Sequence, residues 1–224
     1  MTFTRTRVHL ALLAAALTFP ASLLAQDKVE KPPLGFFITS SGLGKGGDLG
    51  GTEGADAHCQ ALAEKAGSGE RRWRAYLSTQ ATASTPAINA RDRIGSGPWA
   101  NANGDIIATD LDDLHYNNAN INYDMALDEN GNTVNSAARG DTPNRHDILT
   151  GTQLNGTAFE PGEDRTFANW TSDDKGSAML GHHDRYRFTT PGSPWNQAHP
   201  SRGCSQEALM TTGSDGLFYC FAAD

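Results

Sequence analysis

Apolar residues recur at helical spacing between residues 51 and 66, and this pattern predicts the element that organises the rest of the chain. The apolar stripe consists of Ala55, Cys59, Leu62, Ala63 and Ala66. Polar residues such as Asp56 are expected to face away from this stripe. We therefore expect an amphipathic helix of about three turns, capped by Thr52 and ended by Gly67.

Other segments have the alternating pattern and the flanking turn residues of short strands. They are residues 34–40, 73–79 and 101–108, together with a hairpin in residues 125–134 around Asn130-Gly131. Residues 88–94 predict a second short helix or turn. Many Gly, Asn, Asp and Pro residues separate these segments. This composition indicates a loop-rich fold with short strands.

The first residues have the pattern of an export signal. A basic start, Arg5 and Arg7, precedes an apolar run over residues 8–24, and Ala25 offers a cleavage point. A membrane anchor is the less favoured interpretation, because polar residues and a proline interrupt the run and it is short for a span. We expect residues 1–25 to be a signal peptide, residues 26–33 a short linker and residues 34–224 one domain, in a periplasmic or secreted protein.

Charge narrows the range of partners. The whole chain has 18 Lys and Arg against 26 Asp and Glu; without the two arginines of the signal, the balance is 16 − 26 = −10. An acidic chain without a basic cluster is unsuited to nucleic acid and to anionic membrane surfaces. We therefore expect no nucleic-acid partner, and no membrane span once the signal is removed.

The helical segment and the strand after it, residues 54–67 and 73–78, resemble the first helix and following strand of the endostatin-like family. This family has the C-type lectin-like fold, and its bacterial secreted relatives are often labelled lectin. Later segments resemble such domains in the same order: a central strand and turn at residues 148–157, a strand pair at 167–172 and 176–181, Trp195-Asn196, and a last strand at 217–221. The resemblance implies a fold of the α+β class, with a mixed antiparallel sheet, one or two helices and long loops.

The three cysteines leave one unpaired in an exported protein. The resemblance implies a disulfide between Cys59 and Cys220, from the first helix to the last strand, with Cys204 as a free thiol. A bridge between Cys204 and Cys220 is the competing arrangement. A bridge that closes the longer loop stabilises by about 4–5 kcal/mol in the chain-entropy model.

Histidines and carboxylates gather densely in one set: His146, His182, His183, Asp184 and His199. Imidazole and carboxylate ligands suit zinc or copper. Because His182 and His183 are adjacent, they would point to opposite faces of a strand and could not easily bind one ion there. If the loops that carry His146, Asp147, His182, His183 and His199 converge, at least three of these side chains should lie within about 4–5 Å of a common point. We expect a cleft near His182 and His183 more than a bound ion.

The resemblance also raises the calcium site of C-type lectins. That site uses a Trp-Asn-Asp strand and a Glu-Pro-Asn or Gln-Pro-Asp loop, whereas here Gln197 follows Trp195-Asn196 and Pro143-Asn144 precedes the central strand. The calcium set is therefore incomplete. Zinc and calcium are the two metals to consider.

No complete catalytic motif is present, and no nucleophile elbow. We therefore expect an exported, non-enzymatic binding module that recognises carbohydrate or an extracellular or cell-envelope protein through its long loops. The expected ligand-binding residues are Asn144, Arg145, His146, Asp147, His182, His183, Asp184, Trp195, Asn196 and His199. The alternative is a metal-binding protein or metal-dependent enzyme that uses the histidine set.

Overall fold

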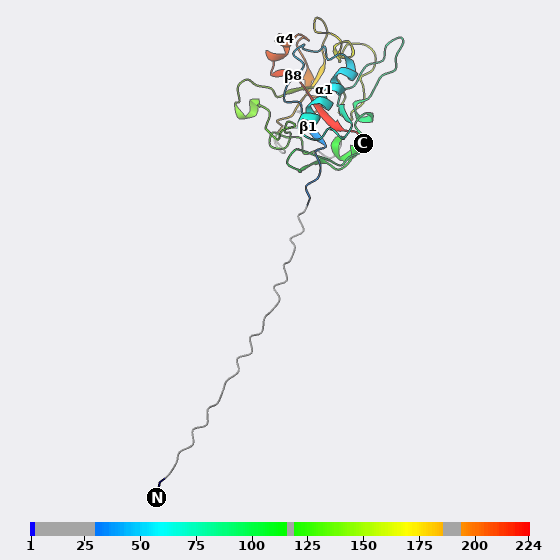
Figure 1. Cartoon of the computed structure of the whole chain (residues 1–224). Coiled ribbons are helices and arrows are strands. Elements are labelled where there is room, and N and C mark those ends of the chain that lie inside the picture. Colours follow the sequence, from blue (N-terminus) through cyan, green and yellow to red (C-terminus); the bar gives the residue numbers. More distant parts are fainter. Residues whose placement is uncertain (3–29, 116–118, 186–193) are drawn as a thin grey trace. The chain divides into compact units, whose positions relative to one another are not determined.

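The computed structural model describes residues 1–2, 30–115, 119–185 and 194–224 (Figure 1). Residues 3–25 of the expected signal peptide and residues 26–29 of the expected linker lie outside these residues. The chain divides into two units, Met1–Glu30 and Lys31–Asp224, and the second contains every element described below. Among the described residues, no helix is both long and apolar enough to span a membrane.

The main sheet is built around one long strand, β8 (Ser214–Ala222). One edge of β8 pairs with β1, antiparallel; the other edge pairs with β2, antiparallel, and with β5, parallel. Strand β6 then pairs with β5, and β7 with β6. A separate two-stranded sheet joins β3 and β4. The bounds are β1 Phe36–Ile38, β2 Trp73–Ala75, β3 Trp99–Ala100, β4 Ile106–Ala108, β5 Asp147–Leu149, β6 Met179–His182 and β7 His199–Pro200.

Four α-helices and two short 3-10 turns complete the described part of the folded unit, which is therefore α+β. They are α1 Gly51–Lys65, α2 Leu111–His115, α3 Phe167–Trp170, α4 Gln206–Met210, η1 Ala90–Asp92 and η2 Ala137–Arg139. The expected amphipathic helix is confirmed as α1. Its expected cap is wrong: Gly50 precedes the helix with φ 72°, no side chain caps it, and Thr52 is buried inside its first turn.

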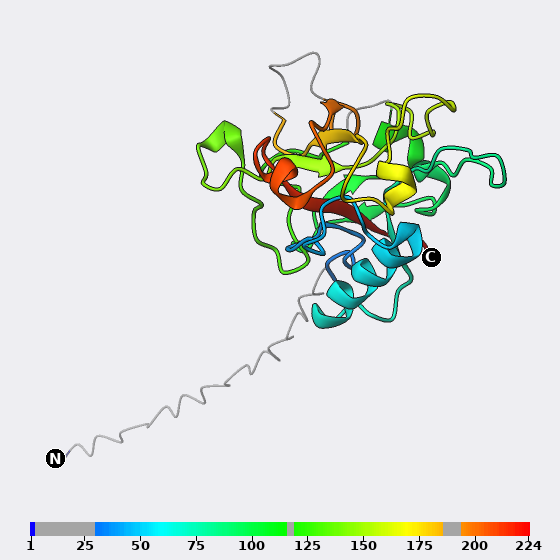
Figure 2. The same ribbon diagram turned by 90° about the horizontal axis from the view of Figure 1, so that it is seen from above.

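Both faces of β8 are buried, because its side chains alternate between two cores. Phe218 and Cys220 lie in a core under α1, while Leu217, Tyr219 and Phe221 lie in a second core covered by the long loops. Figure 2 shows α1 alongside the strand, with the loops on the other side. Burial of each large side chain contributes about 1.5–3 kcal/mol, so β8 is a principal source of stability.

The expected disulfide is confirmed. Cys59 on α1 is bonded to Cys220 on β8 and closes a loop with a sequence separation of 161 residues. Cys204 is free and buried, and burial raises the pKa of its thiol. The covalent link therefore joins the helix to the central strand of the sheet.

Asp56 is buried, not directed to solvent as the polar pattern of the helix indicated. Its carboxylate accepts hydrogen bonds from Arg93 at 2.7 and 2.8 Å, from Arg74 at 2.7 Å, and from the backbone N–H of Ala75 at 2.9 Å. A buried charge is tolerated when it is paired and fully hydrogen-bonded. These bonds hold α1 against β2 next to the disulfide.

Two of the expected strands are absent. Residues 167–170 form a turn in the left-handed region, with φ between 49° and 68°, because Phe167 and Trp170 both enter the core under α1. The backbone N–H of Trp170 donates to Thr166 at 2.7 Å and closes this turn. Trp195-Asn196 is a bend before β7, not a strand. Tertiary burial here outweighs the local strand pattern.

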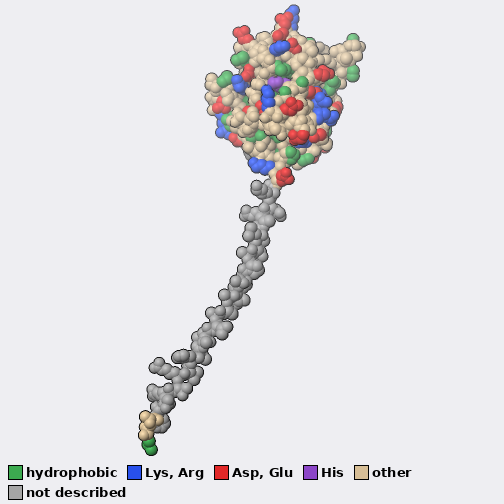
Figure 3. Space-filling model, viewed as in Figure 1, with side chains coloured by type: hydrophobic (Ala, Val, Ile, Leu, Met, Phe, Trp, Pro, Cys, Tyr) green, Lys and Arg blue, Asp and Glu red, His purple; other side chains and the backbone are tan. Residues whose placement is uncertain are grey.

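The surface of the folded unit has mixed charge on the face in Figure 3, where Lys and Arg side chains are interspersed with Asp and Glu. Ion pairs such as Arg71 with Asp224 and Arg139 with Asp124 join opposite charges on the surface. Such exposed pairs contribute little to stability.

We predict that Ala168→Gly stabilises the protein. Ala168 is exposed and has φ 51°, a conformation that costs an L-residue about 1–2 kcal/mol and glycine almost nothing. Thermal or denaturant unfolding should show a gain of about 1 kcal/mol, and the matched variant Ala57→Gly on the exposed face of α1 should lose a similar amount. A loss of stability in Ala168→Gly would contradict the left-handed turn.

Candidate metal centre

Three adjacent strands bring one aspartate and three histidines together. Asp147 of β5 and His182 of β6 form a cross-strand pair, and His146 immediately precedes Asp147. His199 of β7 pairs with Leu180, which places it diagonally across from His182 on the same face. Cross-strand and diagonal neighbours in a sheet lie within side-chain reach of each other. The pairing of β5, β6 and β7 therefore builds the cluster.

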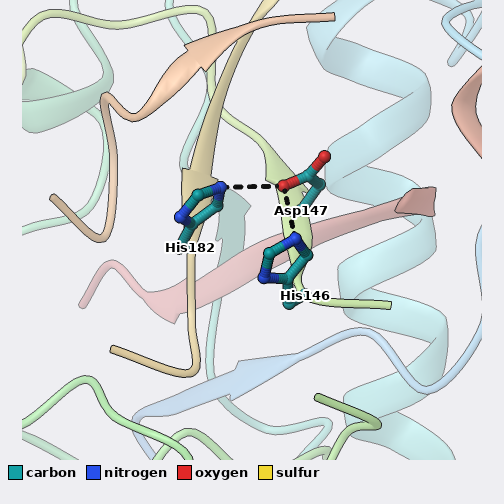
Figure 4. Close-up of side chains that lie close together, drawn as sticks. All are labelled: His146, Asp147 and His182. Atoms are coloured by element: carbon teal, nitrogen blue, oxygen red, sulfur yellow. Dashed lines mark ion pairs between the residues drawn. The ribbon is translucent and has the colours of Figure 1, made fainter. Parts of the chain in front are cut away.

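The imidazole nitrogens converge on one carboxylate oxygen. Oδ1 of Asp147 lies 3.0 Å from Nε2 of His182, 3.3 Å from Nε2 of His146 and 3.5 Å from Nε2 of His199. Figure 4 shows His146 and His182 close to Asp147, each with a ring nitrogen directed at this oxygen. The rings of His146 and His182 are stacked, with centroids 4.4 Å apart.

These separations match those between metal ligands. Atoms bonded at about 2.0–2.1 Å to one tetrahedral zinc ion lie about 3.3 Å apart. One ligand atom each from His146, Asp147 and His182 forms a group in which every pair lies within 4.8 Å. His199 is next to this group, with its Nε2 3.0 Å from Nε2 of His182. Two histidines and one carboxylate could therefore hold an ion, with His199 at the edge.

Asp147 has an unusual environment for a charged side chain. Its side chain is fully buried, and neither carboxylate oxygen has a hydrogen bond with any residue that the structure describes. A buried carboxylate without compensation costs several kcal/mol, and a cation removes most of that cost. The contacts between Oδ1 of Asp147 and the imidazole nitrogens lack hydrogen-bond geometry. This oxygen is therefore in a position to bind a cation that lies between it and the histidines.

The opposite edges of the imidazole rings are held by oxygen acceptors. Nδ1 of His146 lies 3.3 Å from Asp184, whose other oxygen accepts a hydrogen bond of 2.6 Å from Ser136. Nδ1 of His199 lies 3.1 Å from the carbonyl of Pro200. A proton on Nδ1 leaves the Nε2 lone pair directed at Asp147, which is the tautomer that metal ligation requires. Asp184 thus orients a ligand instead of being one.

Electrostatics link the members of this network. Burial lowers the pKa of His146, but the hydrogen bond to Asp184 and the charges of Asp147 and Asp184 outweigh burial, so the net shift is upward. Burial raises the pKa of Asp184, yet its hydrogen bonds with His146 and Ser136 dominate and lower it. Asp184 is therefore a stable anion that supports His146.

The structure does not bring three of the expected residues to this point. His183 follows the end of β6 and is buried, with Nε2 3.3 Å from the carbonyl of Asn135, and burial lowers its pKa to about 4. Trp195 packs against Tyr76 and Tyr219. The side-chain amide of Asn196 donates hydrogen bonds inside the protein, so Trp195 and Asn196 are core residues.

A pocket of about 640 Å³ adjoins the cluster. Three expected ligand-binding residues line it: Asn144, Arg145 and His199. Arg145 forms an ion pair of 2.9 Å with Asp215, which also lines the pocket. The pocket has the size of small-molecule sites.

Sequence reasoning missed Ser136 and most of the pocket wall, including Arg202 and Gly213. Gly213 has φ 94°, and a Cβ there would lie 2.3 Å from the side chain of Asn144 and 3.0 Å from that of His146. Local pattern carries no signal for such contacts, because they depend on how distant loops meet. Comparison with protein-family models and with curated proteins gives no match, so the chemistry of these residues carries the functional argument.

We predict that Asp147→Asn has opposite effects with and without metal. In excess chelator at pH 8.5, above the ordinary titration range of histidine, the variant should be more stable by about 1–3 kcal/mol because a buried unpaired charge is removed. With excess zinc the wild type should be the more stable protein, since the ion binds only the folded state. Thermal unfolding under both conditions checks this. Asp128→Asn, which alters a hydrogen-bonded turn carboxylate, should lose stability equally in both.

Proposed function

We propose that this protein is an exported metal-binding module that holds zinc through Nε2 of His146, a carboxylate oxygen of Asp147 and Nε2 of His182. One observation carries the proposal: a buried carboxylate oxygen without a hydrogen bond faces three imidazole nitrogens at 3.0–3.5 Å. Three protein ligands leave a fourth position for water, for a bound molecule or for His199. This is the alternative interpretation of the sequence, and the geometry favours it.

The donor set selects among metals. Two imidazoles and one carboxylate suit zinc, and they also suit copper. Calcium takes six to eight oxygen ligands. Nitrogen forms most of this centre, so calcium fits it poorly. We therefore propose zinc as the resident ion.

The fold and location that the sequence suggests belong to the same proposal. A first helix bonded by a disulfide to the last strand agrees with an endostatin-like, C-type lectin-like domain. A disulfide needs an oxidising compartment, which supports export to the periplasm or the exterior. The basic and apolar start of the chain points in the same direction.

The zinc site is tested by metal analysis and calorimetry. The purified protein should bind zinc at one equivalent, and His182→Gln should abolish this binding at micromolar zinc because it removes a ligand nitrogen. His58→Gln is the matched control, since His58 lies on α1 and contacts the carbonyl of Ser41. Zinc binding by His182→Gln equal to that of the control would refute the site.

A second candidate function is recognition of a glycan or an envelope protein. The pocket favours this second function, because Asn144 and Arg145 present polar groups in the pocket wall and lie outside the group of possible metal ligands. A non-enzymatic binding module would use such a pocket on a rigid scaffold.

A glycan array, with the protein zinc-loaded or treated with chelator, tests this second function. Binding of any glycan should fall at least tenfold in Arg145→Gln, which removes a charge from the pocket wall. The exposed Arg139→Gln is the control, because it changes an arginine paired with Asp124 outside the pocket. No binding to glycans or to envelope protein would leave the metal-binding role alone.

A further inference from the structure

The metal cluster and the pocket share a wall. His199 lines the pocket and its Nε2 lies 3.0 Å from Nε2 of His182. Gly213 also lines the pocket, and the space beside its Cα is taken up by His146 and Asn144. With no side chain, Gly213 leaves only backbone between the pocket and the edge of His146. A molecule in this pocket therefore lies next to His199 and Gly213, which adjoin the proposed zinc ligands His182 and His146.

One guanidinium in the wall of the pocket forms no ion pair with a carboxylate of the described residues. Arg145 is ion-paired with Asp215 at 2.9 Å. Arg202 is exposed, and its side chain has neither an ion pair nor a hydrogen bond with any residue in the described part of the chain. A zinc ion bound by one carboxylate would keep a net positive charge beside it. Two positive centres at one pocket favour an anionic group, and arginine matches a carboxylate in shape.

Hydroxyl groups in the pocket wall add a second requirement. Thr211 donates its hydroxyl hydrogen to the carbonyl of Ala208 at 2.7 Å, and Thr212 donates to the carbonyl of Leu209 at 3.1 Å. With their hydrogens used inside the protein, these oxygens can only accept from a ligand. A ligand with its own hydroxyl donors satisfies them.

We infer that the pocket and the proposed zinc centre form one site for a hydroxycarboxylate, with Arg202 binding its carboxylate and the zinc binding a second oxygen. The inference rests on the proposed zinc site and names the ligand class of that site. A free hydroxy acid and an acidic sugar carry the same chemistry. The ligand would enter beside His199, whose side chain is 43% exposed, whereas Asp147 is fully buried.

Calorimetry on the purified protein, with and without one equivalent of zinc, tests the inference with four probes. Malate is the free hydroxy acid, glucuronate the acidic sugar, succinate lacks the hydroxyl group, and glucose lacks the carboxylate. Malate or glucuronate should bind the zinc-loaded protein at least tenfold more tightly than the zinc-free protein. Succinate and glucose should bind the zinc-loaded protein at least tenfold more weakly than whichever of malate and glucuronate binds more tightly.

Arg202→Gln should weaken the binding of malate or glucuronate, whichever binds the wild type more tightly, at least tenfold. Zinc should still bind this variant at one equivalent. Arg139→Gln, on the surface outside the pocket, should change neither the binding of the probe nor the binding of zinc. Equal binding with and without zinc, or no effect of Arg202→Gln, would overturn the inference and leave the zinc site intact. Failure of the wild type to bind zinc would overturn the proposed function itself. A fifth probe, inorganic phosphate, tests the ligand class: tighter binding of phosphate than of both hydroxycarboxylates would overturn it.

Discussion

Burial of β8 on both faces is the constraint on which the rest of the structure depends. Its side chains alternate between two cores, and its edges pair with β1, β2 and β5. A strand with no solvent-exposed face requires cover on each side, which α1 provides on one face and the long loops on the other. The Cys59–Cys220 disulfide and the hydrogen bonds of Asp56 then hold the helix in place. The chain thus forms one core on each side of a single strand.

The candidate metal centre follows from the same arrangement. Because β5 pairs in parallel with the start of β8, Asp147 lies opposite Ser214, beside the turn that carries Gly213. The hydroxyl of Ser214 donates to the carbonyl of Asp147 at 2.8 Å and holds that end of β5. Strands β6 and β7 extend the sheet from β5 and add their histidines on the same face. A rigid sheet edge gives metal ligands the precision that a mobile loop would not.

Two buried carboxylates in this protein, Asp56 and Asp147, differ in their hydrogen-bond partners. Asp56 accepts hydrogen bonds from two arginines and a backbone N–H, so its charge is neutralised within the fold. Asp147 faces three imidazole nitrogens, and within the described part of the chain its carboxylate has no hydrogen bond. The hydrogen bonds of Asp56 stabilise the position of α1. The arrangement of Asp147 keeps a stability cost that a bound cation would remove, and such costs are typical of functional sites.

The sequence by itself determined the elements that local spacing controls: α1, the first strand, the Asn130-Gly131 turn and the last strand. It also indicated His146, Asp147, His182 and His199, because histidines are few in the chain and several of them lie near carboxylates in its second half. Only the tertiary structure decided that His183, Trp195 and Asn196 turn inward, that Asp184 supports His146, and that Gly213 and Arg202 meet at a pocket. Strand pairing and core burial act between residues far apart in the chain, and no local periodicity records them.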